Sequence, residues 1–189
     1  MNGLYELLIR LVISNCLNTL AQLQQAYFAC YIKQDYFFRQ SDHEKAINQK
    51  RSKWLRKAGL ARYWLKSNKN NSTKWQVIFS KVEHLSEIIF SLNQLRFRVH
   101  EKALFEMCFV EMQSLEKSST TALRKIAKSL FYNKHFFDSE EMAAAIHAFE
   151  AISDRVLKIA SNEPIIFLFF IQDLYALNDA ISQFYEKTN

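Results

Sequence analysis

The residues of this sequence that could hold a metal ion do not have the spacing of a metal site. A di-iron centre in a helical bundle needs Glu-x-x-His on two helices, with inward-facing carboxylates from the others. The chain contains no Glu-x-x-His: His147 and Glu150 stand in the reverse order, and the five histidines are scattered singly. The sequence therefore predicts no metal site and no bound cofactor.

Catalysis by a nucleophile or by paired acids has no signature either. Gly3 and Gly59 belong to no phosphate-cradling or nucleophile-elbow motif, and no serine lies in a local catalytic pattern. Glu83 and Glu87 are one helical turn apart, but such pairs are common on solvated helix faces. We therefore expect that this protein is not an enzyme.

The strongest local bias is positive charge. Residues 45–74 contain ten Lys or Arg residues and no Asp or Glu. Such a stretch can meet the phosphates of nucleic acid or of anionic lipids, or it can be an ordinary solvated helix face. The side chains that we expect at an anionic surface are Lys50, Lys53, Arg56, Lys57 and Arg62.

Aromatic residues interleave with these charges, namely Trp54, Tyr63, Trp64 and Trp75. Stacking on nucleic-acid bases is one use for such rings, but packing against neighbouring helices is the favoured one. Because no helix-turn-helix or other nucleic-acid signature accompanies them, nucleic acid is not the expected partner.

Length and composition favour a single all-helical domain. The chain has 189 residues with a net charge of +6, two glycines and one proline, which leaves little material for hairpin turns. Cys16, Cys30 and Cys108 are odd in number and follow no metal-ligand spacing, so we interpret them as small buried residues of a reducing compartment.

The apolar periodicity predicts an antiparallel bundle of about six helices, of which the first is long and the last is central and highly apolar. Their expected ranges are 4–38, 42–66, 74–99, 102–132, 139–160 and 163–186 within one domain, 1–189. A Ser-x-x-Glu capping box at Ser41 predicts the second start, and Pro164 predicts the last. The last helix, apolar on every side in its first turns, is the expected centre.

Inward positions follow from 3–4 spacing along each predicted helix. They are Leu8, Leu11, Leu20, Leu23, Tyr27 and Tyr31; Ile47, Trp54, Ala58, Ala61 and Leu65; Ile78, Val82, Leu85, Ile89, Leu92, Leu95 and Val99; Leu104, Cys108, Leu115, Ala122, Ile126 and Leu130; and Met142, Ala145, Ile146, Phe149, Ile152, Val156 and Ile159. Residues 11–32 carry no charge, but their several Asn and Gln residues argue against a membrane span. No signal peptide is expected.

Taken in order, several stretches resemble one known domain: ACYIKQDYFF, the Arg- and Leu-rich residues 51–65, VEHLSEIIFSL, and FLFFIQDLYALNDAI. The chain is similar, over residues 14–185, to the soluble helical domain of the fusaric acid resistance (FUSC) family, in its YccS/YhfK-type branch of inner-membrane proteins. The motifs are degenerate, and none is a catalytic signature.

The resemblance implies a non-catalytic domain at the cytoplasmic face of a bacterial inner membrane, part of an efflux transporter and acting by helix-to-helix contacts. The implied partners are transmembrane halves of the same or a companion protein, with an anionic membrane surface and a homo-oligomer as further candidates. The alternatives are a free-standing, soluble cytoplasmic bundle that binds a protein, and a nucleic-acid-binding domain that uses residues 45–74.

Overall fold

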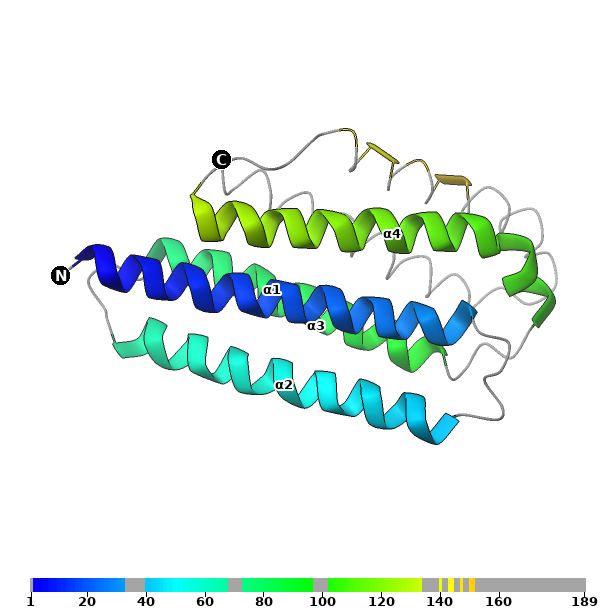
Figure 1. Cartoon of the computed structure of the whole chain (residues 1–189), viewed down its shortest axis with the longest axis horizontal. Helices are drawn as coiled ribbons and strands as arrows, with labels where there is room; N and C mark the ends of the chain where they lie inside the picture. The colour runs from blue at the N-terminus through cyan, green and yellow to red at the C-terminus, as the bar shows by residue number, and fades with distance from the viewer. Residues whose placement is uncertain are drawn as a thin grey trace.

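The computed structural model describes residues 2–32, 40–67, 73–96 and 102–133, together with residues 140, 143, 144, 147, 150 and 151. The four long segments are the helices α1 (Asn2–Ile32), α2 (Gln40–Ser67), α3 (Thr73–Arg96) and α4 (Lys102–Tyr132). Successive helices run in opposite directions (Figure 1). The described residues contain no strand, so the predicted all-α class is confirmed for them.

The predicted ranges 42–66 and 102–132 lie within two residues of the bounds of α2 and α4, whereas the ends predicted at 38 and 99 lie outside the described residues. The described part of α2 begins at Gln40, one residue before the capping box predicted at Ser41. After α4, Asn133 has a φ of 51°, the left-handed conformation that often ends a helix.

Two of the six predicted helices fall wholly or mostly outside the described residues. The range 163–186, predicted to be the central helix, lies outside the described residues, as do the inward positions predicted within 139–160. The residues described from that second range are helical and exposed; they are Glu140, Ala143, Ala144, His147, Glu150 and Ala151.

Within the described part of the chain, α1 is the helix around which the others pack. It contacts α2, α3 and α4, whereas α2 and α3 touch each other only slightly. Its fully buried side chains are Ile9, Ile13, Leu17, Leu20 and Leu23. Beyond Arg10 this helix carries no charge, so it can bury apolar side chains against neighbours on several sides.

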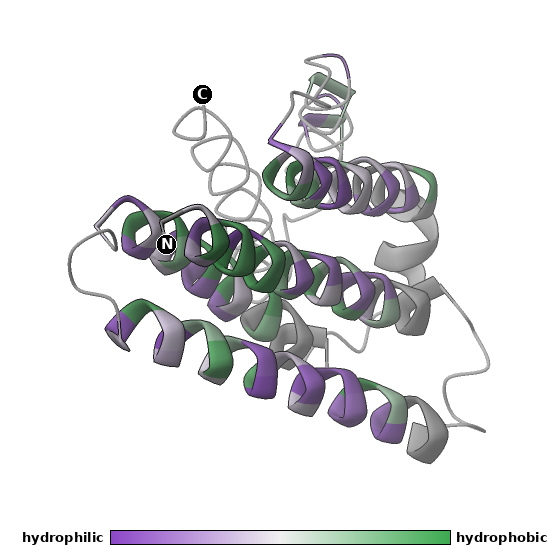
Figure 2. Cartoon of the chain, turned by 60° about the vertical axis from the view of Figure 1, so that its left-hand side comes forward, coloured by the Kyte–Doolittle hydropathy of each residue, from purple (hydrophilic) through white to green (hydrophobic). Residues whose placement is uncertain are grey.

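The stripes predicted for α2 and α3 are confirmed wherever burial is described: Ile47, Trp54, Ala58, Ala61, Leu65, Ile78, Val82, Leu85 and Ile89 are buried, and so are Ala122, Ile126 and Leu130 of α4. On α1, Leu20, Leu23 and Tyr27 are buried, but Leu11 is exposed and Leu8 is half-buried. Figure 2 shows the contrast between the mostly hydrophobic start of α1 and the largely hydrophilic α2. Spacing alone selects the wrong face on a helix that is apolar on most sides.

Polar side chains also join α1 to α4 inside the core. The Ser14 hydroxyl donates to the Ala127 carbonyl at 2.7 Å, and the Gln24 side-chain amide donates to the Ser119 hydroxyl. Buried hydrogen-bonding groups of this kind must find partners, so they favour one alignment of the two helices over others.

Candidate anionic-surface contact

All of the chain's net positive charge is carried by one helix. Within α2, eight Lys or Arg residues stand against Asp42 and Glu44, an excess of six that equals the +6 of the whole sequence. The rest of the chain is therefore formally neutral. A charge concentrated in this way produces a local field that attracts anions.

Lys57, one of the predicted surface cations, is instead part of the α1–α2 packing. Its Nζ donates to the Thr19 hydroxyl at 2.8 Å and to the Asn15 carbonyl at 3.3 Å. Burial lowers the pKa of Lys57 below its ordinary value, nearby Lys53 lowers it further, and Cys16 acts in the opposite direction. Because its ammonium group is half-buried and bonded within the fold, Lys57 is a structural lysine.

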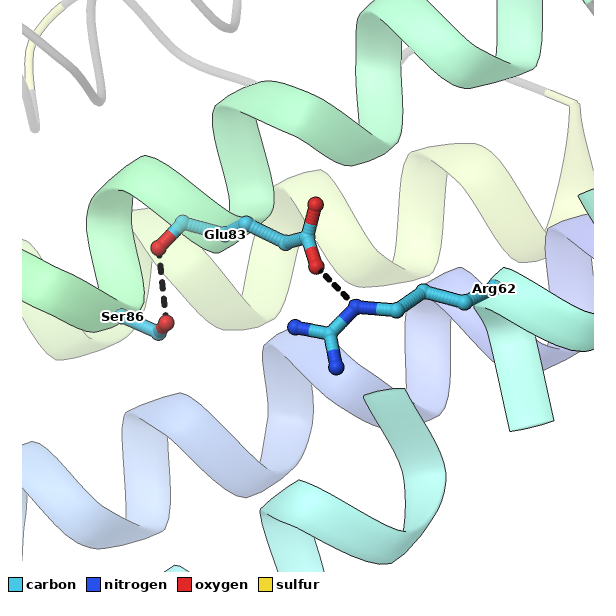
Figure 3. Close-up of polar contacts among 3 residues, drawn as sticks. All are labelled: Arg62, Glu83 and Ser86. Atoms are coloured by element: carbon cyan, nitrogen blue, oxygen red, sulfur yellow. Dashed lines mark hydrogen bonds and ion pairs between the residues drawn. The ribbon is translucent and has the colours of Figure 1, made fainter. Parts of the chain in front are cut away.

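Arg62, a second predicted cation, joins α2 to α3. Its Nε lies 2.5 Å from Oε1 of Glu83, and the Ser86 hydroxyl donates to the Glu83 carbonyl at 2.6 Å (Figure 3). The Arg62 side chain is 50% exposed and that of Glu83 is 29% exposed. A neutralised, partly covered guanidinium contributes little to an anion-binding surface.

Three of the predicted cations have no ion-pair or hydrogen-bond partner among the described residues. Lys53 and Arg56 are exposed and Lys50 is half-buried, and none of them forms an ion pair or hydrogen bond within the described part of the chain. Two of these, Lys53 and Arg56, line an open hollow of about 570 Å³ together with Lys45, Asn48, Gln49 and Ser52. Sequence reasoning had missed those last four as surface contacts.

The missed residues lie on one face of the helix, which a helical-wheel projection of the sequence would identify. The lining positions recur at intervals of three and four along α2, on the side turned away from its buried stripe at Ile47, Trp54 and Leu65. Three cations and three neutral hydrogen-bonding side chains on one face can hold a phosphate-bearing surface electrostatically. The described residues that line the hollow include no His, Asp or Glu that could activate the Ser52 hydroxyl.

The aromatic residues near this face are mostly committed to packing. Trp54 and Trp75 are buried, and Trp64 is half-buried. The Trp54 ring meets Phe90 edge-on, with ring centroids 5.5 Å apart, and the Arg51 guanidinium lies 4.9 Å from the centre of the Phe90 ring. Packing, the favoured reading of these rings, is therefore confirmed for the tryptophans.

The described histidines, acids and cysteine do not assemble into a reactive centre. Burial raises the pKa of Cys16 to about 12, an effect strengthened by Glu83 and opposed by Lys57 and Arg62, so its thiol stays protonated. His147 and Glu150 are both exposed, and Nδ1 of His147 lies 3.4 Å from Oε2 of Glu150. No group of His, Cys, Asp or Glu among the described residues has the arrangement to hold a metal ion.

One described helical segment, Gly3–Tyr27, is long and apolar enough to cross a membrane by length and composition alone. More than half of it is buried against the rest of the chain, as in the core helix of a bundle. No protein-family model, curated protein or solved structure matches this chain.

Proposed function

We propose that this chain is a non-catalytic helical domain that works by helix-to-helix contacts at the cytoplasmic face of a bacterial inner membrane, as a soluble part of a FUSC-type efflux transporter. The proposal includes helices over 139–160 and 163–186 that complete an antiparallel bundle of six. It rests on the resemblance of the sequence and on the character of α2.

The observation that carries the proposal is the placement of charge. The excess of six positive charges belongs to one helix, and Lys45, Lys53 and Arg56 project from its outer side without partners in the described part of the chain. The inner leaflet of a bacterial membrane is anionic, and each basic group near such a surface is worth about 1 kcal/mol. A domain held beneath this leaflet by transmembrane segments would gain from such a face.

The first test is the DNA that flanks this reading frame. A transporter domain predicts frames that encode several hydrophobic spans directly before and after it, either in the same gene or in a neighbouring one. The chain produced together with those spans should sediment with the inner membrane and should purify with them after mild detergent extraction. An isolated gene, with the chain staying in the supernatant in its own host, would contradict the transporter assignment.

The two alternatives give other outcomes in the same experiment. A free-standing interaction module would purify with a soluble protein, and a nucleic-acid-binding domain would purify with DNA or RNA at low salt. The burial of Trp54 and Trp75 weighs against the nucleic-acid alternative, because those rings have no free face on which bases could stack.

A further inference from the structure

The outward face of α1 is apolar at its amino-terminal end. Leu4, Leu7 and Leu11 are 67%, 52% and 38% exposed and recur at helical spacing. Further along the same face stand Asn15 and Gln22, which are exposed and uncharged. The outward face of α1 is therefore apolar at its amino-terminal end and polar but uncharged further along. No charged side chain of this stripe favours its exposure to water.

One flank of α2 extends this apolar end. Lys57 donates hydrogen bonds to Asn15 and Thr19 of α1. The side of α2 that carries Lys57, here called the Lys57 flank, therefore borders the outward face of α1. Leu60 lies on the same flank almost one turn later and is 48% exposed. The two helices run in opposite directions (Figure 1), so Leu60, which follows Lys57, lies toward the amino-terminal, leucine-bearing end of α1. The Tyr5 hydroxyl donates to the Trp64 carbonyl at 3.3 Å, which supports this alignment.

The other flank is supplied by α4. Arg124 donates to the Gln25 side chain at 2.6 Å, so its side of α4 borders the outward face of α1 as well. Phe131 lies on that side two turns later and is 37% exposed. The bond from Ser14 to Ala127, one turn before Phe131, places this ring level with the leucine stripe.

The basic end of the same face comes from the other half of α2. Lys53 and Lys50 lie on the Lys57 flank, one and two turns before it respectively, and they are therefore level with the polar half of α1. The apolar–basic face is thus composed of Leu4, Leu7, Leu11, Leu60 and Phe131 at one end and Lys50 and Lys53 at the other.

We infer that the apolar–basic face docks on the surface of an anionic lipid bilayer, with its leucines and Phe131 entering the headgroup boundary and its lysines contacting lipid phosphates. Interfacial binding elements combine these two features, apolar side chains beside lysines and arginines. The inference deepens the proposed membrane-side function by naming which face meets the membrane, and it rests on that function only for its biological setting.

The composition of the face favours lipid over other occupants. A second copy of the chain, seated face to face, would bring the lysines of two α2 helices together in one arrangement, where like charges repel, and would set lysines against leucines in the opposite one, where the charges lose water without gaining a partner. Nucleic acid would use the lysines but would leave the leucine stripe in water, since its backbone offers no apolar layer. A bilayer with anionic headgroups satisfies both ends at once.

The test is flotation of the full chain with vesicles of phosphatidylcholine alone or of phosphatidylcholine with 30% phosphatidylglycerol, a composition chosen for the assay. We expect binding to the mixed vesicles in dilute buffer, release at moderate salt, and little binding to the zwitterionic vesicles. Leu60→Gln should weaken binding to the mixed vesicles about fivefold, because a half-exposed leucine loses its lipid contact. Lys53→Glu should weaken it about tenfold.

Each variant has a matched control on the same helix. Leu55 is 48% exposed, like Leu60, but lies about 140° away around α2, so Leu55→Gln should leave binding unchanged. Lys66→Glu makes the same charge change as Lys53→Glu on the far side of the helix. All four positions are exposed, and circular dichroism melts will show that the variants fold.

Equal losses for Leu60→Gln and Leu55→Gln would overturn the inference, as would binding to neither kind of vesicle. The chain should also be tested with duplex DNA at the same salt. If it binds DNA more tightly than the mixed vesicles, and Leu60→Gln does not weaken DNA binding, the inference is overturned in favour of nucleic acid. The flanking DNA test is independent of these results. If the chain does not bind vesicles but its reading frame is flanked by frames that encode transmembrane spans, the docking face is wrong and the transporter assignment stands.

Discussion

Replacing Leu20 by alanine tests whether α1 is the helix around which the described bundle is organised. Leu20 is fully buried on the helix that contacts the other three. Buried leucine-to-alanine changes cost about 2–5 kcal/mol, and the cost is greatest where neighbours cannot collapse into the cavity. Because α1 is held by helices on several sides, we expect about 3–4 kcal/mol. In a chain of this size that corresponds to a fall in Tm of roughly 6–16 °C.

The matched control is Leu7→Ala on the same helix. Leu7 is 52% exposed, so its truncation should cost less than about 1 kcal/mol. Urea unfolding followed by circular dichroism gives both free energies of unfolding in the same buffer. If the two variants lose the same stability, the burial of the Leu20 face contributes nothing special and the central place of α1 is wrong.

Four further outcomes are expected. A double-mutant cycle with Arg62→Ala and Glu83→Ala should give a coupling below about 1 kcal/mol, because the pair is partly exposed; several kcal/mol would contradict this. The pKa of Lys57 is lowered in the folded state, so between that lowered pKa and 10.5 the unfolded state binds more protons than the folded state. The free energy of unfolding of the parent, relative to that of Lys57→Gln, should therefore increase as the pH rises toward 10.5. Native Cys16 should resist iodoacetamide at pH 8 and react in urea, as peptide mass mapping will show. Phe170→Ala, in the segment predicted as central, should cost about 3–5 kcal/mol, and a melt within a degree or two of the parent would refute that prediction.

Amphipathic helices were predictable from the sequence, and the uniformly apolar helix was not. On α2 the basic residues occupy every side but one, so the stripe at Ile47, Trp54 and Leu65 was evident. On α1 charge is missing from most of the helix, so leucines on the outer and inner faces look alike by spacing. Leu11 was placed inward and is exposed, because packing against other helices decides the face there.

The cations of the candidate surface were predictable as a group but not one by one. Which of them are free depends on partners far away in sequence: Thr19 for Lys57 and Glu83 for Arg62 lie 38 and 21 residues away. Those partners fall beside the basic helix only after α1 and α3 have packed on it. Lys45 was not named because no single residue marks the face on which it lies. That face is recognised only when the lining positions of α2 are taken together.

Hydrogen–deuterium exchange of the full chain, with and without vesicles that contain phosphatidylglycerol, tests most directly whether this domain meets a membrane through one face. Vesicles should slow amide exchange in the first four turns of α1 and along the Lys50 to Leu60 part of α2, because bound lipid stabilises the segments that it contacts. Exchange in α3 should stay unchanged, since that helix adds nothing to the apolar–basic face. Protection confined to α3, or the same exchange with and without vesicles, would contradict the account.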